Sequence, residues 1–487
     1  MLILLLISRR LYYLWEACKT YFCNLNTTKM DEIDLNKIKY YPDRFYISLD
    51  GFDAKNLTSF ITDLKIGQQQ SIFIHEYYHF LTNITTFCGV RQFNLNFGDR
   101  VRLVINMGFH EKIDAFPIGN PNSKLKECID YWNQVTQILN DDDIDYNLVR
   151  EVIQSPRQKF DIVSVHKVQK RMSTVVDGET INGYRELIKI EIDGLMSTNS
   201  FILTYSAIDE FLSSSIDEFL SENDLSDINP SIFSQRPYYP YQVFDDLIRH
   251  YTGERPEVFE KILLAYFALN SDNPANKLIT ILEKLKDGDY LKFKEDPENY
   301  LLQFRDSSLK HLAIVKTTKK LADESAEQGR IHLAQAIKYY HDKFFFAMKL
   351  KEDDFFYFIR PFFEKEVSER GKQRFLLALA RILNPFTPPV FLQEGIFKVT
   401  DKLTTYGEAT TLIIACYEIF ESLKTEQCAK RPQYLKNKYT FPDQVEDCDD
   451  VSTYKIPIMG IAFQLALNEM GLFKIYIDDY NLKNQQP

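Results

Sequence analysis

SIFIHEYYHFL, residues 71–81, contains the pattern His-Glu-x-x-His at His75, Glu76 and His79. On a helix, positions i and i+4 lie on the same face one turn apart, so both imidazoles can reach one ion. Zinc prefers a tetrahedral set of ligands, and two histidines supply two of its four corners. Glu76 follows the first histidine, where its carboxylate can serve as a general base toward water at the metal. The stretch therefore predicts a zinc site on a helix.

The pattern is specific enough to carry this prediction. With eight histidines in 487 residues, an HExxH match is expected by chance only roughly 0.01 times. The flanking Ile72, Phe73, Phe80 and Leu81 are apolar, which suits a buried metal-binding helix. The alternative is a pair of ordinary histidines, one of them paired with Glu76. A di-iron bundle would need a second ExxH, and the sequence has none.

The third protein ligand has to come from farther along the chain. After His79 the next histidine is His110, which excludes the compact HExxHxxGxxH arrangement and leaves a later glutamate as the expected ligand. A short repeat, IDEFLSSS at 208–215 and IDEFLSEN at 216–223, follows at a suitable distance. We expect its first glutamate, Glu210, to be the third ligand.

Other acidic residues have different expected roles. Asp217 lies seven residues after Glu210, almost on the same helix face, where it can accept a hydrogen bond from the ring N–H of a metal-bound histidine. Glu218 is rotated by about 80° from Glu210 on an ideal helix. Glu218 and Glu394, in FLQEGIF (391–397), remain alternatives for the third ligand.

At these residues the chain resembles a known family. HEYYHFL followed by AIDEFLSSSIDE is similar to the gluzincin arrangement of HExxH plus a later glutamate helix, and to uncharacterised bacterial proteins that carry HEYxH. The resemblance implies a zincin-like fold, metallopeptidase chemistry and Glu210 as the third zinc ligand. The sequence departs from that pattern at Thr82, where such proteins often have Gln, and at Ser213, where Ala is common. The resemblance covers these two helices only.

A zinc hydrolase also needs a donor for the oxyanion that develops during attack on a carbonyl. The segment RPYYPYQVFDDLIRH (236–250) follows the glutamate helix closely enough to fold back over it. We expect Tyr241 and His250 to be catalytic, with Tyr239 and Arg249 as neighbouring candidates. The alternative is that these residues are packing aromatics and a surface pair.

The order of the expected elements indicates an α+β fold that is mainly α-helical. Strands are expected within 36–50 (around RFYISL, 44–49), at 92–97 and at 100–107, and a hairpin at 160–195 turns at Asp177-Gly178. Helices are expected at about 68–88 (closed by Gly89), 125–155, 198–222, across most of 243–380, and at 405–424 and 458–471, with a proline-rich linker at 384–391. We divide the chain into an N-terminal extension (1–30), a zincin-like catalytic domain (31–290) and a mainly helical C-terminal domain (291–487).

Composition narrows the class of protein. The formal net charge of −11 argues against a nucleic-acid-binding protein, because such proteins carry a basic face. Seven cysteines without a CxxC pair indicate free thiols in a reducing compartment. The apolar run Leu2–Ile7 precedes Arg9 and Arg10, which is the reverse of a secretory signal and too short to span a bilayer. We therefore expect a cytoplasmic protein without stable membrane insertion; a short membrane-surface helix is the alternative for this segment.

From these observations we expect a zinc-dependent metallopeptidase that binds one Zn²⁺ through His75, His79 and Glu210, with Glu76 as the base. Its substrate would be a protein or peptide. The alternative is a zincin-fold binding or regulatory protein with little or no hydrolysis. In either case the helical C-terminal region would be the surface for a protein partner.

Overall fold

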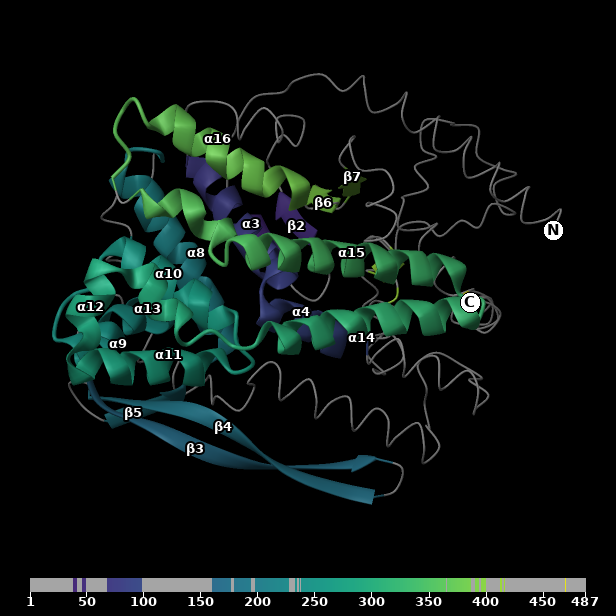
Figure 1. Cartoon of the computed structure of the whole chain (residues 1–487), viewed down its shortest axis with the longest axis horizontal. Coiled ribbons are helices and arrows are strands. Elements are labelled where there is room, and N and C mark those ends of the chain that lie inside the picture. The colour runs from purple at the N-terminus through teal and green to yellow at the C-terminus, as the bar shows by residue number, and fades with distance from the viewer. Residues whose placement is uncertain are drawn as a thin grey trace, which may run out of the picture. The chain divides into compact units, whose positions relative to one another are not determined.

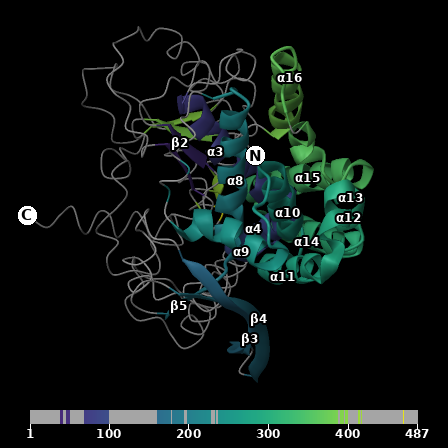
Figure 2. The same cartoon turned by 90° about the vertical axis from the view of Figure 1, so that its left-hand side faces the viewer.

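Helix α3 (Gln68–Thr85), which contains the HEYYH residues, is the central helix of the fold. In the computed structural model it packs against α8 (Tyr205–Glu222), α15 (Ile331–Asp353) and strand β1 (Ile38–Tyr41). Figure 1 and Figure 2 show α3 and α8 side by side. Its apolar side chains are buried on all sides, since they face three different elements: Phe73, Ile74, Tyr77, Tyr78, Phe80, Leu81 and Ile84.

The structure describes residues 38–41, 46–49, 68–98, 160–176, 179–193, 198–226, 233, 236, 238–364, 366–386, 390–393, 396–399, 412, 413, 416 and 469. All of them belong to a unit that spans Lys37–Pro487. The remaining helices are α4 (Phe87–Phe93), α9 (Val243–Thr252), α10 (Val258–Leu269), α11 (Pro274–Lys284), α12 (Tyr290–Glu295), α13 (Pro297–Leu302), α14 (Ser308–Glu327) and α16 (Lys372–Leu383). Short π turns cover Asn94–Gly98, Tyr238–Gln242 and Leu285–Asp289, and 3₁₀ turns cover Tyr357–Phe363 and Asn384–Phe386.

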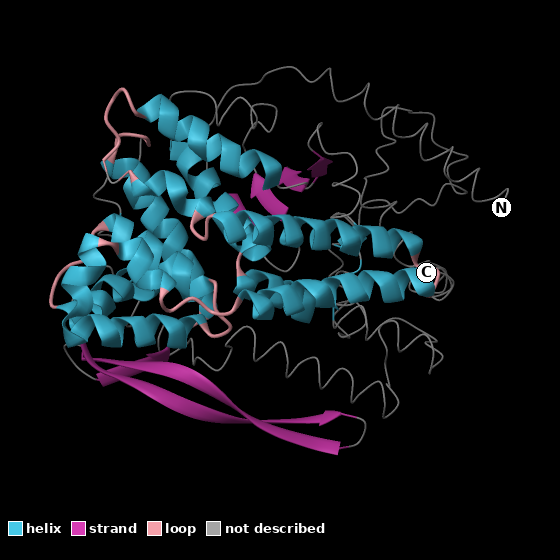
Figure 3. Ribbon diagram, viewed as in Figure 1, coloured by secondary structure: helices cyan, strands magenta, loops and turns pink. Residues whose placement is uncertain are grey.

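Two small sheets accompany the helices. The first has the strand order β1-β2-β6-β7, in which β2 (Tyr46–Leu49) pairs in parallel with β6 (Val390–Gln393) and the other neighbours, including β7 (Ile396–Val399), are antiparallel. The second contains the expected hairpin, β3 (Asp161–Val176) and β4 (Glu179–Asp193), with β5 (Thr198–Ile202) on β4. Figure 3 shows this hairpin as a long magenta ribbon beside the helices. The described part of the chain is therefore mainly helical with little sheet, as expected.

One expected element was wrong, and another begins later than expected. QFNLNF (92–97) is helical and not a strand. Phe93 and Phe97, four residues apart, lie on one face of the helical turn with their ring centroids 5.4 Å apart. A strand, with its period of two, also places residues i and i+4 on one face. The spacing of the two phenylalanines therefore could not distinguish a strand from a helix. Residues 198–202 form β5 and not the first turn of a helix. Helix α8 begins later, where the Thr204 side chain accepts a hydrogen bond from the Ala207 backbone N–H at 3.0 Å.

The expected boundary at residue 290 is not a break in the hydrophobic core. Helix α15, from the predicted C-terminal domain, packs against α3, and the Tyr77 hydroxyl donates to the Leu383 carbonyl at 2.8 Å. The expected strand at 100–107, the helix at 125–155 and the extension at 1–30 lie outside the described residues. The helices expected at 405–424 and 458–471 are described only at residues 412, 413, 416 and 469, and these residues are helical. No helix among the described residues is both long and apolar enough to cross a membrane.

The sequence predicts that Gly89 ends the helix of the HEYYH residues. Instead, Gly89 lies inside α4, close to the junction with α3. A Cβ atom at this position would lie 2.4 Å from both the Thr82 carbonyl oxygen and the Asn83 Cα atom. Because both are backbone atoms, Gly89→Ala should force the two helices apart and lower the free energy of unfolding by about 1–3 kcal/mol. Chemical denaturation measures this change. The control is Gly98→Ala, whose Cβ would meet only the Leu321 side chain at 3.3 Å; equal stabilities of the two variants would contradict the prediction.

Candidate metal centre

Helix α8 runs antiparallel to α3 and places its acidic residues against the two histidines. Ser71 and His75, near the start of α3, both contact Asp217 near the end of α8. His79 and Thr82, farther along α3, both contact Asp209 near the start of α8. Both helices are buried on most of their surface, and their contacts build the site from residues about 130 positions apart.

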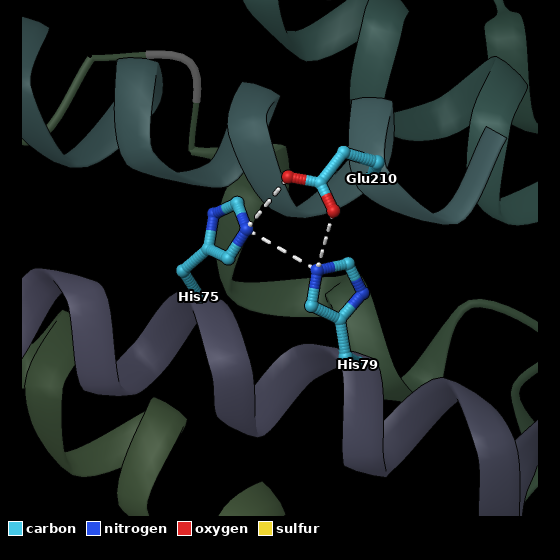
Figure 4. Close-up of side chains that lie close together, drawn as sticks. All are labelled: His75, His79 and Glu210. Atoms are coloured by element: carbon cyan, nitrogen blue, oxygen red, sulfur yellow. Dashed lines mark hydrogen bonds and ion pairs between the residues drawn. The ribbon is translucent and has the colours of Figure 1, made fainter. Parts of the chain in front are cut away.

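Three side chains converge between the helices, as Figure 4 shows. His75 Nε2 lies 3.2 Å from Glu210 Oε1, His79 Nε2 lies 3.1 Å from Glu210 Oε2, and the two Nε2 atoms are 3.2 Å apart. The ligands of a tetrahedral ion with bonds of about 2.0–2.1 Å lie roughly 3.3–3.4 Å apart. The observed separations are close to this value, with each histidine nitrogen beside a different oxygen of Glu210. His75, His79 and Glu210 could hold a metal ion.

The other nitrogen of each histidine is held by an aspartate. His75 Nδ1 lies 2.8 Å from Asp217 Oδ2, and His79 Nδ1 lies 2.7 Å from Asp209 Oδ2. A carboxylate only accepts hydrogen bonds, so each Nδ1 carries the proton and each Nε2 is left to face Glu210. This carboxylate–histidine pair is the arrangement that orients metal-binding imidazoles.

The charges at the centre favour positive charge, as protons or a metal ion, between the two histidines and Glu210. Burial lowers the pKa of His75, but Asp217 and then Glu210 outweigh it and raise the pKa to about 10. Burial opposes protonation of His79 too, and Asp209 with Glu210 still raises its pKa well above the usual value. Burial raises the pKa of Glu210, but His79 and His75 hold it well below its usual range. Two lone pairs and a carboxylate this close repel one another unless protons or a metal ion lie between them.

Glu76 lies on the same helix, beside the ligand residues. Its Oε2 accepts a hydrogen bond from the Tyr40 backbone N–H of β1 at 2.6 Å. Burial raises the pKa of Glu76, and the nearby His75 and His79 oppose that change in part. A buried carboxylate with a raised pKa, next to a metal centre, is suited to proton transfer near neutral pH.

Tyr241 reaches the centre and His250 does not. The Tyr241 hydroxyl donates to Glu210 Oε1 at 2.6 Å, and burial followed by Glu210 raises its pKa. His250 is exposed on the last turn of α9, where its ring packs against Tyr251. Its described contacts do not include the three ligand residues, so the structure does not support His250 as a catalytic group. α9 turns its apolar residues inward and leaves Arg249 and His250 in solvent.

Of the two alternative ligands, only Glu218 lies among the described residues, and it is not in the cluster. Glu218, in the second copy of the repeat, pairs with Lys261 Nζ at 2.8 Å. Glu394 lies outside the described residues. The two copies of the repeat therefore differ in their contacts. In the first copy Asp209 contacts His79 and Glu210 belongs to the cluster. In the second copy only Asp217 contacts a histidine.

Two contributors were missed in the sequence. Asp209 could have been found from the repeat, since it is the copy of Asp217 eight residues earlier. Arg236 could not have been found in the sequence, because no local pattern marks it. In the structure its Nη2 lies 2.9 Å from Asp217 Oδ2, and its guanidinium lies over the Tyr241 ring at 5.1 Å. Arg236 neutralises the aspartate behind His75 and links it to the tyrosine that contacts Glu210.

Asp209→Asn and Asp217→Asn should each weaken zinc binding by about 10–100-fold, because each change loosens the orientation of one histidine. A competition titration with a chromophoric chelator measures the affinity. Glu222→Gln, an exposed glutamate on the same helix, is the matched control and should bind zinc like the unmodified protein. Affinities of the aspartate variants within twofold of that control would contradict an orienting role.

Comparisons of this chain with protein-family models, with curated proteins and with solved structures found no match.

Proposed function

We propose that the protein is a zinc-dependent metallopeptidase with a zincin-like, gluzincin-type arrangement of α3 and α8. The observation that carries the proposal is the convergence of His75, His79 and Glu210 with ligand separations of 3.1–3.2 Å. Two imidazoles and one carboxylate are a donor set typical of catalytic zinc, which keeps a fourth position open for water or substrate. Glu76 next to them favours an enzyme, because a purely structural zinc site has no need of that carboxylate.

Each residue of the centre has a chemical task in this proposal. A bound zinc ion would supply a polarised water of lowered pKa and a Lewis acid for the substrate carbonyl. Glu76 accepts the proton of the attacking water and passes it to the leaving amine. Tyr241 has its hydroxyl on Glu210 and is the nearest described phenol that can donate to a developing oxyanion. Asp209 and Asp217 hold the imidazoles in position.

One contact favours the second candidate, a zincin-fold binding or regulatory protein. Glu76 Oε2 is already occupied by the Tyr40 N–H at 2.6 Å, and a base held in this way has less freedom to accept a proton. In this reading the metal stabilises the packing of α3 on α8, and the helical C-terminal region binds a protein partner. In both readings we place the protein in the cytoplasm and expect a protein or peptide as the bound molecule.

Zinc content and its removal test the proposal. We expect near one zinc per chain by elemental mass spectrometry of untagged protein. We also expect hydrolysis of a peptide mixture, followed by mass spectrometry, that a chelator abolishes and added zinc restores. Zinc without hydrolysis would favour the binding protein. No zinc, even after the metal is added back, would refute both readings.

A further inference from the structure

A second cluster of polar side chains surrounds a surface pocket at the start of α14. None of the residues that line the pocket belongs to the metal centre. The polar side chains that line it come from three segments: Asn270, Arg305, Ser307, Ser308, His311 and Lys351.

Lys351 of α15 is a buried lysine without an anionic partner among the described residues. Its side chain is 3% exposed, and its Nζ donates to the Thr85 carbonyl, to Asn270 Oδ1 at 2.8 Å and toward His311 Nδ1 at 3.4 Å. All three partners are neutral, and no ion pair joins Lys351 to a carboxylate within the described ranges. Burial, followed by the charge of Arg305, lowers its pKa well below the usual value. A buried ammonium is costly unless a counter-charge accompanies it.

His311 presents an unused donor at the same place. A charged Lys351 can only donate to Nδ1, which leaves the ring proton on Nε2. Nε2 is buried with no hydrogen-bond partner in the described part of the chain. The ring is held edge-on against Phe87 at 5.7 Å, which fixes its direction. Burial, with Lys351 and Arg305, lowers the pKa of His311 to about 2, so the ring is neutral and Nε2–H remains a donor. Buried donors without acceptors are rare and usually indicate an unseen partner.

Arg305 and the end of a long helix add positive potential. The Arg305 guanidinium lies over the Phe355 ring at 4.8 Å, and it forms no ion pair with a carboxylate in the described part of the chain. Helix α14 has 20 residues and begins at the pocket, with Ser307 as its N-cap and no acidic residue in its first turn. The N-terminus of a helix attracts anions through its free N–H groups and its dipole.

The two acidic residues in the pocket lining do not neutralise this cluster. Asp306 pairs with Lys277 at 2.6 Å, and Glu352 pairs with Lys349 at 2.6 Å. Their charges are therefore matched by lysines of their own, while Arg305 and Lys351 lack a described carboxylate partner.

We propose that this pocket binds a small oxyanion, the phosphate or carboxylate group of a ligand, between Arg305, Lys351 and His311 at the start of α14. The anion accepts from the Arg305 guanidinium, from the free Nε2–H of His311 and from the helix N-terminus, and it supplies the counter-charge for Lys351. This assignment is independent of the metal centre and of hydrolysis.

Phosphate binding tests the proposal. Isothermal titration of the full chain with sodium phosphate, and in parallel with sodium acetate, should show saturable binding of at least one of them that sodium chloride at equal ionic strength does not reproduce. Arg305→Gln and His311→Leu should each weaken that binding at least about tenfold, because each removes a donor to the anion. Arg255→Gln, an exposed arginine elsewhere, should have no effect. Arg305 is exposed, so its variant should fold even if His311→Leu does not.

Three other outcomes would overturn the site. Binding of neither anion would refute it, as would binding that Arg305→Gln leaves unchanged. If Arg236→Gln abolishes anion binding and Arg305→Gln does not, the anion binds at the metal centre instead. Preference for phosphate over acetate, or the reverse, would tell which group the natural ligand carries.

Discussion

Glu76→Gln is expected to leave zinc content and fold intact and to reduce peptide hydrolysis by about 10²–10⁴-fold, the usual contribution of general acid–base catalysis. The amide has the shape of the carboxylate, and its oxygen can still accept from the Tyr40 N–H, which contacts Glu76 at 2.6 Å. It cannot take a proton from water at neutral pH. Zinc per chain and the rate of cleavage, measured on the same preparation, separate the two properties.

The outcome of this substitution decides between the two candidate functions. A cleavage rate that survives Glu76→Gln with zinc retained would mean that Glu76 is not the base. A cellular or binding phenotype that survives the change would favour the regulatory protein, since it would then depend on the fold and not on proton transfer.

Glu210→Ala is expected to lower zinc affinity at least about 100-fold, more than the loss of a residue that only orients a ligand. The carboxylate lies 3.2 Å from His75 Nε2 and 3.1 Å from His79 Nε2, and it is the single negative charge among the three ligands. Without it, two neutral imidazoles remain for a dication. Elemental mass spectrometry after gel filtration should then show zinc near zero per chain.

The repeat provides a matched control for this substitution. Glu218→Ala changes the same residue in the same local sequence, eight positions later, but removes a carboxylate that pairs with Lys261. Lys261 keeps Asp245 Oδ1 as a partner at 2.8 Å, so the helix should still fold. Zinc near one in Glu218→Ala and near zero in Glu210→Ala would establish the ligand. Full zinc in both variants would move the third ligand elsewhere, with Glu394 as the next candidate.

Local pattern was sufficient wherever neighbours in sequence are also neighbours in space. The four-residue spacing of His75 and His79 placed both rings on one helix face, and the seven-residue spacing of Glu210 and Asp217 placed both carboxylates toward them. The strand residues around Asp177-Gly178 predicted the long hairpin for the same reason, since a two-residue turn fixes the pairing of the strands that it joins.

Local pattern failed where two structures share the same spacing. In QFNLNF the apolar residues could serve a strand or a helix, and packing of Phe93 on Phe97 and Tyr340 goes with the helix. His250 was expected at the site because it is close in sequence to the glutamate helix, but the amphipathic α9 turns it to solvent. Distance along the chain does not tell which face of a helix is buried.

By itself, the sequence determined the two site helices, their facing residues and an α+β fold that is mainly helical, because these depend on periodicity within one element. The sequence favoured Glu210 over Glu218, but only the tertiary structure places Glu210 against the histidines and Glu218 against Lys261. Asp209, Asp217 and Arg236 likewise acquire their partners only when α8 lies antiparallel on α3. The physical reason is that charge and hydrogen-bond partners at a buried centre come from segments far apart in the chain, whose relative register is set by the packing of the whole core.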